Sequence, residues 1–354
     1  MKNIGTGNSK FQIQEKSSDA SYAILGSTSV IGYDNNFDFE GNFVLTARVG
    51  ANAGTLYQHS GKVKISDNTV YIQSDNLSFL YNLLNRFDLK KLSFGTGQPL
   101  VKSSELKKLA LNFPNKEEQE KIGNFFNQLD YTIALHQQKQ RQIRSLKQGF
   151  IKNLFPNNKN SAPRIRFSIF NDDWNQRNAS EIFTSVSDKN YPELPVLSAS
   201  QEKGMVLRES NGIDIKYDQK STGTYKRVLP GQFVMHLRSF QGGFAYSTIE
   251  GITSPAYTIL AFRNKEDHYP LFWKSIFSSK NFIKRLEAIT YGIRDGRSIS
   301  YADFSTLRFW IPSYEEQKQI GDFIESIDAT IAFYQRQIDM MQSLKKELLN
   351  KMFI

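Results

Sequence analysis

The sequence contains no cysteine, so disulfide bonds, thiolate metal sites and a cysteine nucleophile are excluded. It also has no apolar run of the length that a membrane-spanning helix requires. Its first residues, MKNIGTGNSKF, lack the apolar segment of a secretory signal. We therefore expect a cytoplasmic protein that does not associate with a membrane.

Motifs of catalysis are also missing. The chain has no P-loop of the form G-x-x-x-x-G-K-[ST]. Ser254-Pro255-Ala256-Tyr257 falls one residue short of the [DNS]-P-P-[YF] motif of adenine methyltransferases, and no glycine-rich cofactor motif precedes it. We predict a non-catalytic chain that holds no metal and no cofactor. The histidines lack the spacing of metal ligands; they are His59, His136, His236 and His268.

The composition is that of a folded protein with an excess of basic residues. The 354 residues include 27 Phe and 16 Tyr, which suffice for more than one core, and the length predicts two or three domains. The formal net charge of +10 favours a polyanionic partner such as nucleic acid, because neutralised phosphates release their counterions. A basic protein without such a partner is the alternative that charge alone leaves open.

An internal repeat organises the chain. Residues 114–155 and 312–353 align without a gap at an offset of 198 residues, and both begin with P-x-x-E-E-Q-x-x-I-G. Each copy has the pattern of one long helix. Asn115 and Ser313 are the expected N-caps, and Glu118 and Glu316 stand at the spacing of a capping box.

The apolar residues of both copies alternate in steps of four and three, which is the a/d pattern of a coiled coil. His136 and Gln140 interrupt this seam, where they would weaken its packing and help to fix its register. We predict an antiparallel pair of long helices; two unrelated amphipathic helices on separate cores are the alternative. The predicted seam positions are Ile122, Phe126, Leu129, Ile133, His136, Gln140, Ile143, Ile320, Ile324, Ile327, Ile331, Tyr334, Ile338 and Met341.

The rest of the chain forms two segments of mixed character that look like diverged copies of one domain. We predict an α+β fold in which two pseudo-repeated mixed α/β domains alternate with the helices of an antiparallel coiled coil. In chain order, the predicted parts are residues 1–113, the helix 114–156, residues 157–311 and the helix 312–354. Strand-like runs occur at residues 42–46, 69–72, 232–235 and 257–260, and helical patterns at residues 77–89 and 269–288.

This order of segments resembles the specificity subunit of type I restriction–modification systems. The resemblance is carried by the helix openings at Pro114 and Pro312, by Pro163-Arg164-Ile165-Arg166-Phe167 with the following Trp174 and Glu181-Ile182-Phe183, and by the duplicated plan. It implies that the two mixed segments are target recognition domains, each of which reads one half of a bipartite DNA site.

The resemblance also implies the partners of the chain. In this family the coiled coil sets the distance between the recognition domains and docks two methyltransferase (modification) subunits, which bring S-adenosylmethionine. Restriction subunits add translocase and nuclease activity, so S-adenosylmethionine, ATP and Mg²⁺ are expected on partner subunits and not on this chain.

One departure from the family pattern concerns the first recognition domain. Roughly twenty residues that open the second domain, about 164–183, have no counterpart ahead of Met1. We therefore expect that the first domain lacks this opening segment, and a partial subunit that acts only as a dimer is an alternative.

Candidate DNA-contacting residues are polar or basic side chains in and around the strands and loops of each domain. The run at residues 292–297 is the best candidate, because Arg294 and Arg297 belong to a loop that contains two glycines, and arginine can bond guanine O6 and N7 together. The candidates are Ser27, Tyr33, Arg48, Lys62, Lys64, Thr96, Gln98 and Lys102 in the first domain, and Ser198, Lys203, Lys226, Arg227, Arg238, Gln241, Arg294, Arg297 and Tyr301 in the second.

Because the two domains differ in sequence, we expect an asymmetric bipartite DNA target. Helices of about 40 residues would form a rod of roughly 60 Å, which would hold the half-sites about one helical turn of DNA apart. The main alternative is a non-catalytic coiled-coil interaction protein whose basic domains bind no specific DNA.

Overall fold

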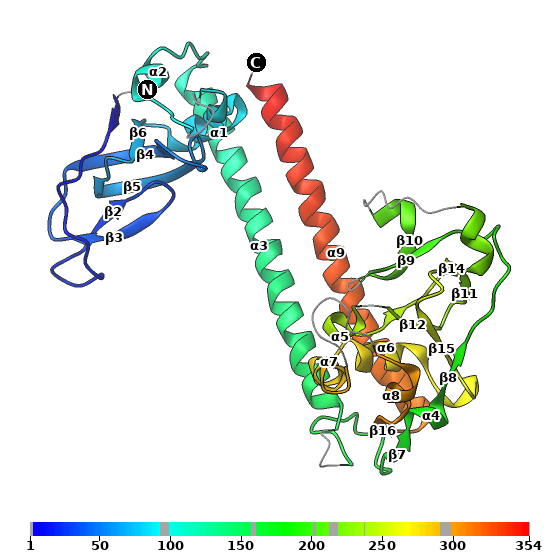
Figure 1. Ribbon diagram of the computed structural model, residues 1–354. Coiled ribbons are helices and arrows are strands. Elements are labelled where there is room, and N and C mark those ends of the chain that lie inside the picture. The colour runs from blue at the N-terminus through cyan, green and yellow to red at the C-terminus, as the bar shows by residue number, and fades with distance from the viewer. Residues whose placement is uncertain are drawn as a thin grey trace. The chain divides into compact units, whose positions relative to one another are not determined.

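The computed structural model describes residues 3–92, 99–156, 161–200, 203–211, 219–236, 238–290 and 299–353 (Figure 1). They form two compact units. Unit 1 comprises Met1–Lys139 and Tyr334–Ile354, and unit 2 comprises Gln140–Phe333. Each unit therefore contains one mixed α/β part and portions of both long helices, α3 (Lys116–Leu154) and α9 (Tyr314–Met352).

Unit 1 is built on a six-stranded sheet with the order β1-β6-β4-β5-β2-β3. Neighbouring strands are antiparallel except β2 and β5, which are parallel. Helix α1 follows the central strand β6 and packs on the sheet (Figure 1). The elements are β1 (Asn3–Thr6), β2 (Tyr22–Leu25), β3 (Val30–Asp34), β4 (Phe39–Ala47), β5 (Leu56–Ile65), β6 (Thr69–Gln73), α1 (Leu77–Phe87), η1 (Leu89–Leu92) and α2 (Ser103–Lys107).

Strand β4 packs apolar side chains on both faces of the sheet. Val44 packs in the cluster beneath α1, whereas its neighbours Phe43 and Leu45 pack in a second cluster on the opposite face. Strand β6 alternates in the same way, with Ile72 beneath α1 and Tyr71 on the other face. Because successive side chains of a strand point to opposite faces, a continuous apolar run is what two covered faces require.

Unit 2 contains a four-stranded sheet, three two-stranded sheets and short helices. Its largest core cluster joins Trp174, Phe183, Trp273 and Phe304 with other aromatic residues. The elements are β7 (Asn175–Asn178), α4 (Ala179–Ile182), β8 (Phe183–Val186), β9 (Leu197–Ser200), β10 (Gly204–Leu207), η2 (Arg208–Asn211), η3 (Gln219–Thr224), β11 (Lys226–Val228), β12 (Phe233–Met235), α5 (Ser239–Gly242), β13 (Ala245–Tyr246), β14 (Gly251–Thr253), β15 (Thr258–Phe262), η4 (Lys265–Asp267), α6 (Pro270–Phe277), α7 (Lys280–Ala288), α8 (Tyr301–Ser305) and β16 (Arg308–Ile311).

Each unit contains its own four-stranded antiparallel core, and the two cores have the same topology. The strand order is β1-β6-β4-β5 in unit 1 and β8-β15-β12-β13 in unit 2, so each strand of one core has a counterpart in the other. The strand second in each order precedes the helix that contacts the start of a long helix, α1 or α6. The predicted duplication of one mixed α/β domain is confirmed.

The predicted runs correspond to the elements of this core with one difference. The strand-like runs fall on β4, β6, β12 and β15, and the first helical pattern falls on α1. The helical pattern at residues 269–288 is confirmed, but the chain divides it into two helices, α6 and α7, which are separated at Ser278 and Ser279. The reason is local, because the Ser279 hydroxyl accepts the N–H of Phe282 and so caps a new helix.

The two long helices run antiparallel in each unit, as predicted. In unit 1 the ring of Phe126 stacks on Phe353. One helical turn further along α3, Asp130 pairs with Lys345 at 2.6 Å. In unit 2 Lys147 pairs with Asp328 at 2.5 Å, and further along α3 the ring of Phe150 meets Phe323. Every predicted seam position is buried or half-buried.

The N-termini of these two helices are capped as the sequence predicted, with one correction. The Asn115 and Ser313 side chains accept the backbone N–H groups of Glu118 (2.9 Å) and Glu316 (3.3 Å), which confirms both N-caps. The capping-box interpretation was wrong for Glu316, because its carboxylate accepts hydrogen bonds from the guanidinium of Arg166 instead.

Candidate nucleic-acid interface

The repeated opening of each long helix, P-x-x-E-E-Q-x-x-I-G, fixes that helix to the start of α1 or α6. In unit 2 the Gln317 amide donates to the carbonyls of Asp267 and Pro312 and accepts the N–H of Tyr269. A Cβ at Gly321 would lie 2.8 Å from the backbone nitrogen of Phe272, so only glycine permits this close approach. The motif thus provides the rigid support on which each mixed domain presents its loops.

Unit 1 repeats this junction with fewer contacts. Gly123 faces the N–H of Phe79, its carbonyl accepts the hydroxyl of Ser78 at 2.8 Å, and the Gln119 amide donates to the carbonyl of Pro114. Both junctions therefore place a helix N-terminus against the motif glycine.

Two basic candidates of unit 1 come together at one end of the sheet. Arg48 follows β4, Lys102 is the N-cap residue of α2, and both side chains are exposed. Val49 pairs with Leu100, and the N–H of Val101 donates to the carbonyl of Arg48 at 2.8 Å, which brings the two segments side by side. Arg48 and Lys102 thus lie on neighbouring backbone segments although they are distant in the sequence.

A second basic group in unit 1 is interleaved with aromatic rings. The Lys62 ammonium lies 4.8 Å from the ring centre of Phe37, and the Lys16 ammonium lies 5.6 Å from that of Tyr33. Such cation–π pairs hold a charge at the surface without neutralising it. The sequence analysis did not single out Lys16 and Phe37, because each lies far in the sequence from the residue that it contacts. Ser27, in the turn after β2, donates to the carbonyl of Asn68.

Lys64 is a structural residue. Its side chain is on β5, two residues from the exposed Lys62, but Lys64 is only 5% exposed. Its ammonium donates to the carbonyl of Lys10 and to the carboxylate of Asp38, both at 3.2 Å. Because a buried charge is held by its partners, Lys64 is removed from the proposed DNA-contacting set.

In unit 2 the exposed candidates are Lys203, in the turn between β9 and β10, and Arg238 with Gln241 at α5. The loop at Arg238 is held by His236, whose Nδ1 accepts the backbone N–H of Arg238 at 3.3 Å. Burial, with a smaller contribution from the charge of Arg238, lowers the pKa of His236 to about 4. The imidazole is therefore neutral near pH 7, which is the form that can accept this bond.

Other candidates of unit 2 are engaged inside the domain. The Lys226 ammonium donates to the carbonyl of Tyr257 at 2.7 Å, and burial lowers its pKa. Arg227 pairs with Glu250 and lies over a tyrosine ring, and the Ser198 hydroxyl accepts from the Nε of Arg208. The Tyr301 hydroxyl donates to the carbonyl of Phe183 at 2.8 Å, so Tyr301 supports the core.

Four candidates lie outside the described residues: Thr96, Gln98, Arg294 and Arg297. In the part of the chain that is described, no cluster of three His, Asp or Glu side chains could hold a metal ion. Within that same part, no helix combines the length and apolar character needed to cross a membrane.

Known proteins resemble this chain both in sequence and in fold. Residues 4–145 match the family model of the type I restriction modification DNA specificity domain. The fold is similar to that of the type I restriction–modification system S subunit from M. genitalium, with a TM-score of 0.62 and 16% identity over 99% of this chain and 93% of that one. It is also similar to a chain from a structural study of complex assembly and conformational transition of the type I R-M system, with a TM-score of 0.54 and 13% identity over 99% of this chain and 97% of that one. The resemblance and the fold class inferred from the sequence are confirmed.

Proposed function

We propose, from the type I restriction modification DNA specificity domain in residues 4–145 and from a fold shared with an S subunit of such a system, that this protein is a DNA specificity subunit. The observation that carries the proposal is the duplicated recognition domain on an antiparallel helix pair. In this role the chain binds DNA and itself catalyses no reaction.

The proposed target is an asymmetric bipartite DNA site, with one half read by each domain. The exposed candidates differ between the domains: Arg48, Lys62 and Lys102 in unit 1, and Lys203, Arg238 and Gln241 in unit 2. Because bases are recognised by the donors and acceptors of individual side chains, two different sets should select two different half-sites. Arg294 and Arg297 remain in the proposed set.

The proposed partners are two methyltransferase subunits and the restriction subunits of the same system. S-adenosylmethionine, ATP and Mg²⁺ would be bound by those subunits. The paired helices offer exposed apolar side chains that such partners could contact, among them Tyr131, Leu135 and Met340.

The proposal is tested by expressing this chain with the modification subunit encoded beside it and mapping N6-methyladenine in the host DNA. We expect one asymmetric two-part motif that is absent without this chain. Arg238→Ala should weaken or relax recognition in one half of that motif, since a lost base contact costs about 1–3 kcal/mol. Lys265→Ala, a change at an exposed lysine of unit 2 that is outside both the candidate set and the long helices, is the matched control and should leave the motif intact.

Two outcomes would contradict the proposal in different ways. A continuous or palindromic motif would refute the asymmetric site and favour a partial subunit that pairs with another copy. Association with the modification subunit without any new methylation of the host DNA would favour a coiled-coil interaction protein.

A further inference from the structure

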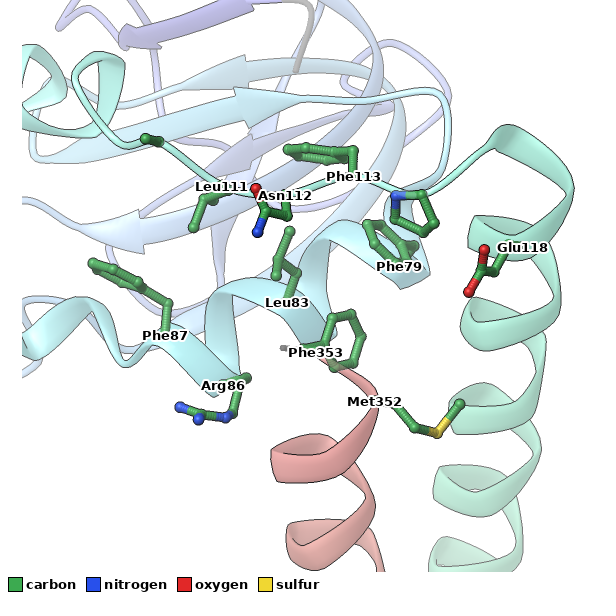
Figure 2. A pocket seen from close by; sticks show the side chains of 12 residues that line it. Phe79, Leu83, Arg86, Phe87, Leu111, Asn112, Phe113, Glu118, Met352 and Phe353 are labelled. Atoms are coloured by element: carbon green, nitrogen blue, oxygen red, sulfur yellow. The ribbon is translucent and has the colours of Figure 1, made fainter.

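Unit 1 contains a groove of about 560 Å³ whose lining is mostly apolar, with Arg86 and Glu118 among the polar residues, and includes none of the candidate DNA-contacting residues (Figure 2). Its walls come from α1, from residues 110–114, from the first turn of α3 and from the last residues of α9. Phe79, Leu83 and Phe353 form its floor, and Glu118 stands at one side (Figure 2).

The corresponding place in unit 2 is filled. The repeat offset of 198 residues relates Phe113 to Ile311, Glu118 to Glu316 and Phe353 to Phe155. The motif glycines relate Phe79 to Phe272, since the backbone nitrogens of these two residues face Gly123 and Gly321. In agreement, Phe79 contacts Phe353 in unit 1 (5.3 Å between ring centres) and Phe272 contacts Phe155 in unit 2 (5.5 Å).

The filling segment of unit 2 first contributes an arginine. The Arg166 guanidinium donates through Nε and a terminal nitrogen to both carboxylate oxygens of Glu316, each at 2.8 Å. Glu316 is only 1% exposed. Its counterpart Glu118 is exposed, and the described residues of the chain provide it with no ion-pair partner.

The segment then contributes a tryptophan and a strand. Trp174 is 2% exposed and its ring lies 6.0 Å from that of Phe272. The next residues form β7, which pairs antiparallel with β16 immediately ahead of α9. In unit 1, residues 110–113 occupy the place of β16, and no described residue pairs with them as a strand.

The difference in exposure is what an unfilled site predicts. Phe113 is 38% exposed, whereas its counterpart Ile311 is 6% exposed. The groove therefore combines an apolar floor, a carboxylate without an ion-pair partner among the described residues, and a backbone segment, residues 110–113, that no described strand pairs with. Unit 2 covers the corresponding places with one continuous segment.

We propose that this groove is a docking site for an extended segment of another polypeptide, which presents an arginine to Glu118 and, eight residues later, a tryptophan to Phe79. The segment then continues as a strand along residues 110–113. Arginine suits this position because its planar fork matches a carboxylate in two hydrogen bonds, and strand addition satisfies backbone groups independently of sequence. The inference rests on the geometry of unit 1 and holds whether or not the chain reads DNA.

The test uses the full chain and a fluorescein-labelled peptide with the sequence of residues 161–178, SAPRIRFSIFNDDWNQRN. Fluorescence anisotropy should show saturable binding of this peptide. Replacing its arginine at the position of Arg166 by glutamate, or its tryptophan by alanine, should weaken binding at least tenfold. Hydrogen exchange should show new protection at residues 110–113 when the peptide is bound.

Charge reversal on the protein locates the site. Glu118→Lys should weaken binding at least tenfold and should bind the glutamate-bearing peptide better than the original one. Glu117→Lys is the matched control, because Glu117 is exposed on the same turn of α3 and does not line the groove. The proposal is overturned by the absence of saturable binding, by equal binding to the two variants, or by protection that appears elsewhere than at residues 110–113.

Discussion

At the scale of single residues, burial decides the chemical state of the polar side chains in unit 2. His268 packs between aromatic rings, stacked on Phe262 at 5.4 Å and edge-on to Trp273 at 5.8 Å. Burial, to which the charge of Arg177 adds and which Asp267 opposes, lowers the pKa of His268 to about 4. The imidazole therefore packs as a neutral aromatic ring at pH 7.

This histidine makes the stability of unit 2 dependent on pH. The unfolded chain protonates His268 near pH 6.5 and the folded chain only near pH 4, so the unfolded state binds more protons between these values. Stability is fully present above pH 6.5 and is lost as the pH falls toward 4. His268→Phe should reduce this loss by roughly 2 kcal/mol.

The measurement is urea unfolding followed by tryptophan fluorescence at pH 7.5, 5.5 and 4.5. All three tryptophans, Trp174, Trp273 and Trp310, lie in unit 2, so the signal reports on that unit alone. His59→Phe, in unit 1, should leave the pH dependence unchanged. Parallel loss of stability in wild type and His268→Phe would contradict the role assigned to His268.

At the scale of elements, the junction between a long helix and its domain depends on a glycine that helix propensity alone disfavours. Gly321 and Gly149 both lie inside long helices of unit 2. A Cβ at Gly321 would meet the backbone of Leu271 and Phe272 within 3.0 Å, whereas a Cβ at Gly149 would meet nothing within 4 Å. The same substitution should therefore have opposite effects at the two positions.

Gly149→Ala should stabilise the protein by about 1 kcal/mol, because alanine loses less backbone entropy in a helix. Gly321→Ala gains the same propensity but forces α6 and α9 apart, so we expect a net loss of about 1–3 kcal/mol. Tryptophan-detected unfolding of the two variants checks both signs. Equal stabilisation by both substitutions would mean that the close approach at Gly321 does not hold the domain.

The seam between the helices contains one ion pair in each unit, and the repeat makes them equivalent. Asp130 pairs with Lys345, and the residues 198 positions away, Asp328 and Lys147, form the second pair. These side chains are part-exposed, so each pair should contribute no more than about 1 kcal/mol and less at high salt. Their value lies in orientation, because a parallel arrangement would not bring these charges together.

Asp328→Lys should lower the melting temperature of the helices, followed by circular dichroism at 222 nm, because it places two ammonium groups together. Adding Lys147→Asp should restore most of the loss at low salt. Combining Asp328→Lys with Lys345→Asp, whose partner is in the other unit, should give no rescue. Rescue by both combinations, or by neither, would contradict the pairing.

At the scale of the whole molecule, the proposed function predicts that DNA reading and assembly with partners are separable. Each unit presents its own exposed basic residues, while the long helices carry the shared repeat. Sequence specificity can therefore change in one domain without disturbing the other, provided that each junction is retained.

If the proposed function holds, replacing residues 161–311 by the second recognition domain of a type I specificity protein should change one half of the methylated motif and preserve the other. The junction residues at the start of α9 are kept in this exchange, so docking to the modification subunit should persist. Methylome sequencing with the modification subunit present checks the motif, and co-purification checks the docking. A change in both halves would show that the domains do not read independently.

The sequence by itself determined the elements that local chemistry controls. The gapless repeat with its four-three spacing predicted the two long helices, their N-caps and their seam, because helix periodicity and capping act over a few residues. The apolar runs of β4 and β6 likewise predicted buried strands. The sequence did not predict the break between α6 and α7, because a continuous helical pattern does not reveal that Ser279 will cap a new helix.

Only the tertiary structure decided which polar residues face solvent. Lys62 and Lys64 stand two positions apart on β5, yet Lys62 is exposed and Lys64 is buried against Asp38. In the same way Glu118 and Glu316 occupy one motif position, and only Glu316 is covered by an arginine. The physical reason is that burial depends on segments distant in the chain, and no pattern of neighbouring residues contains that information.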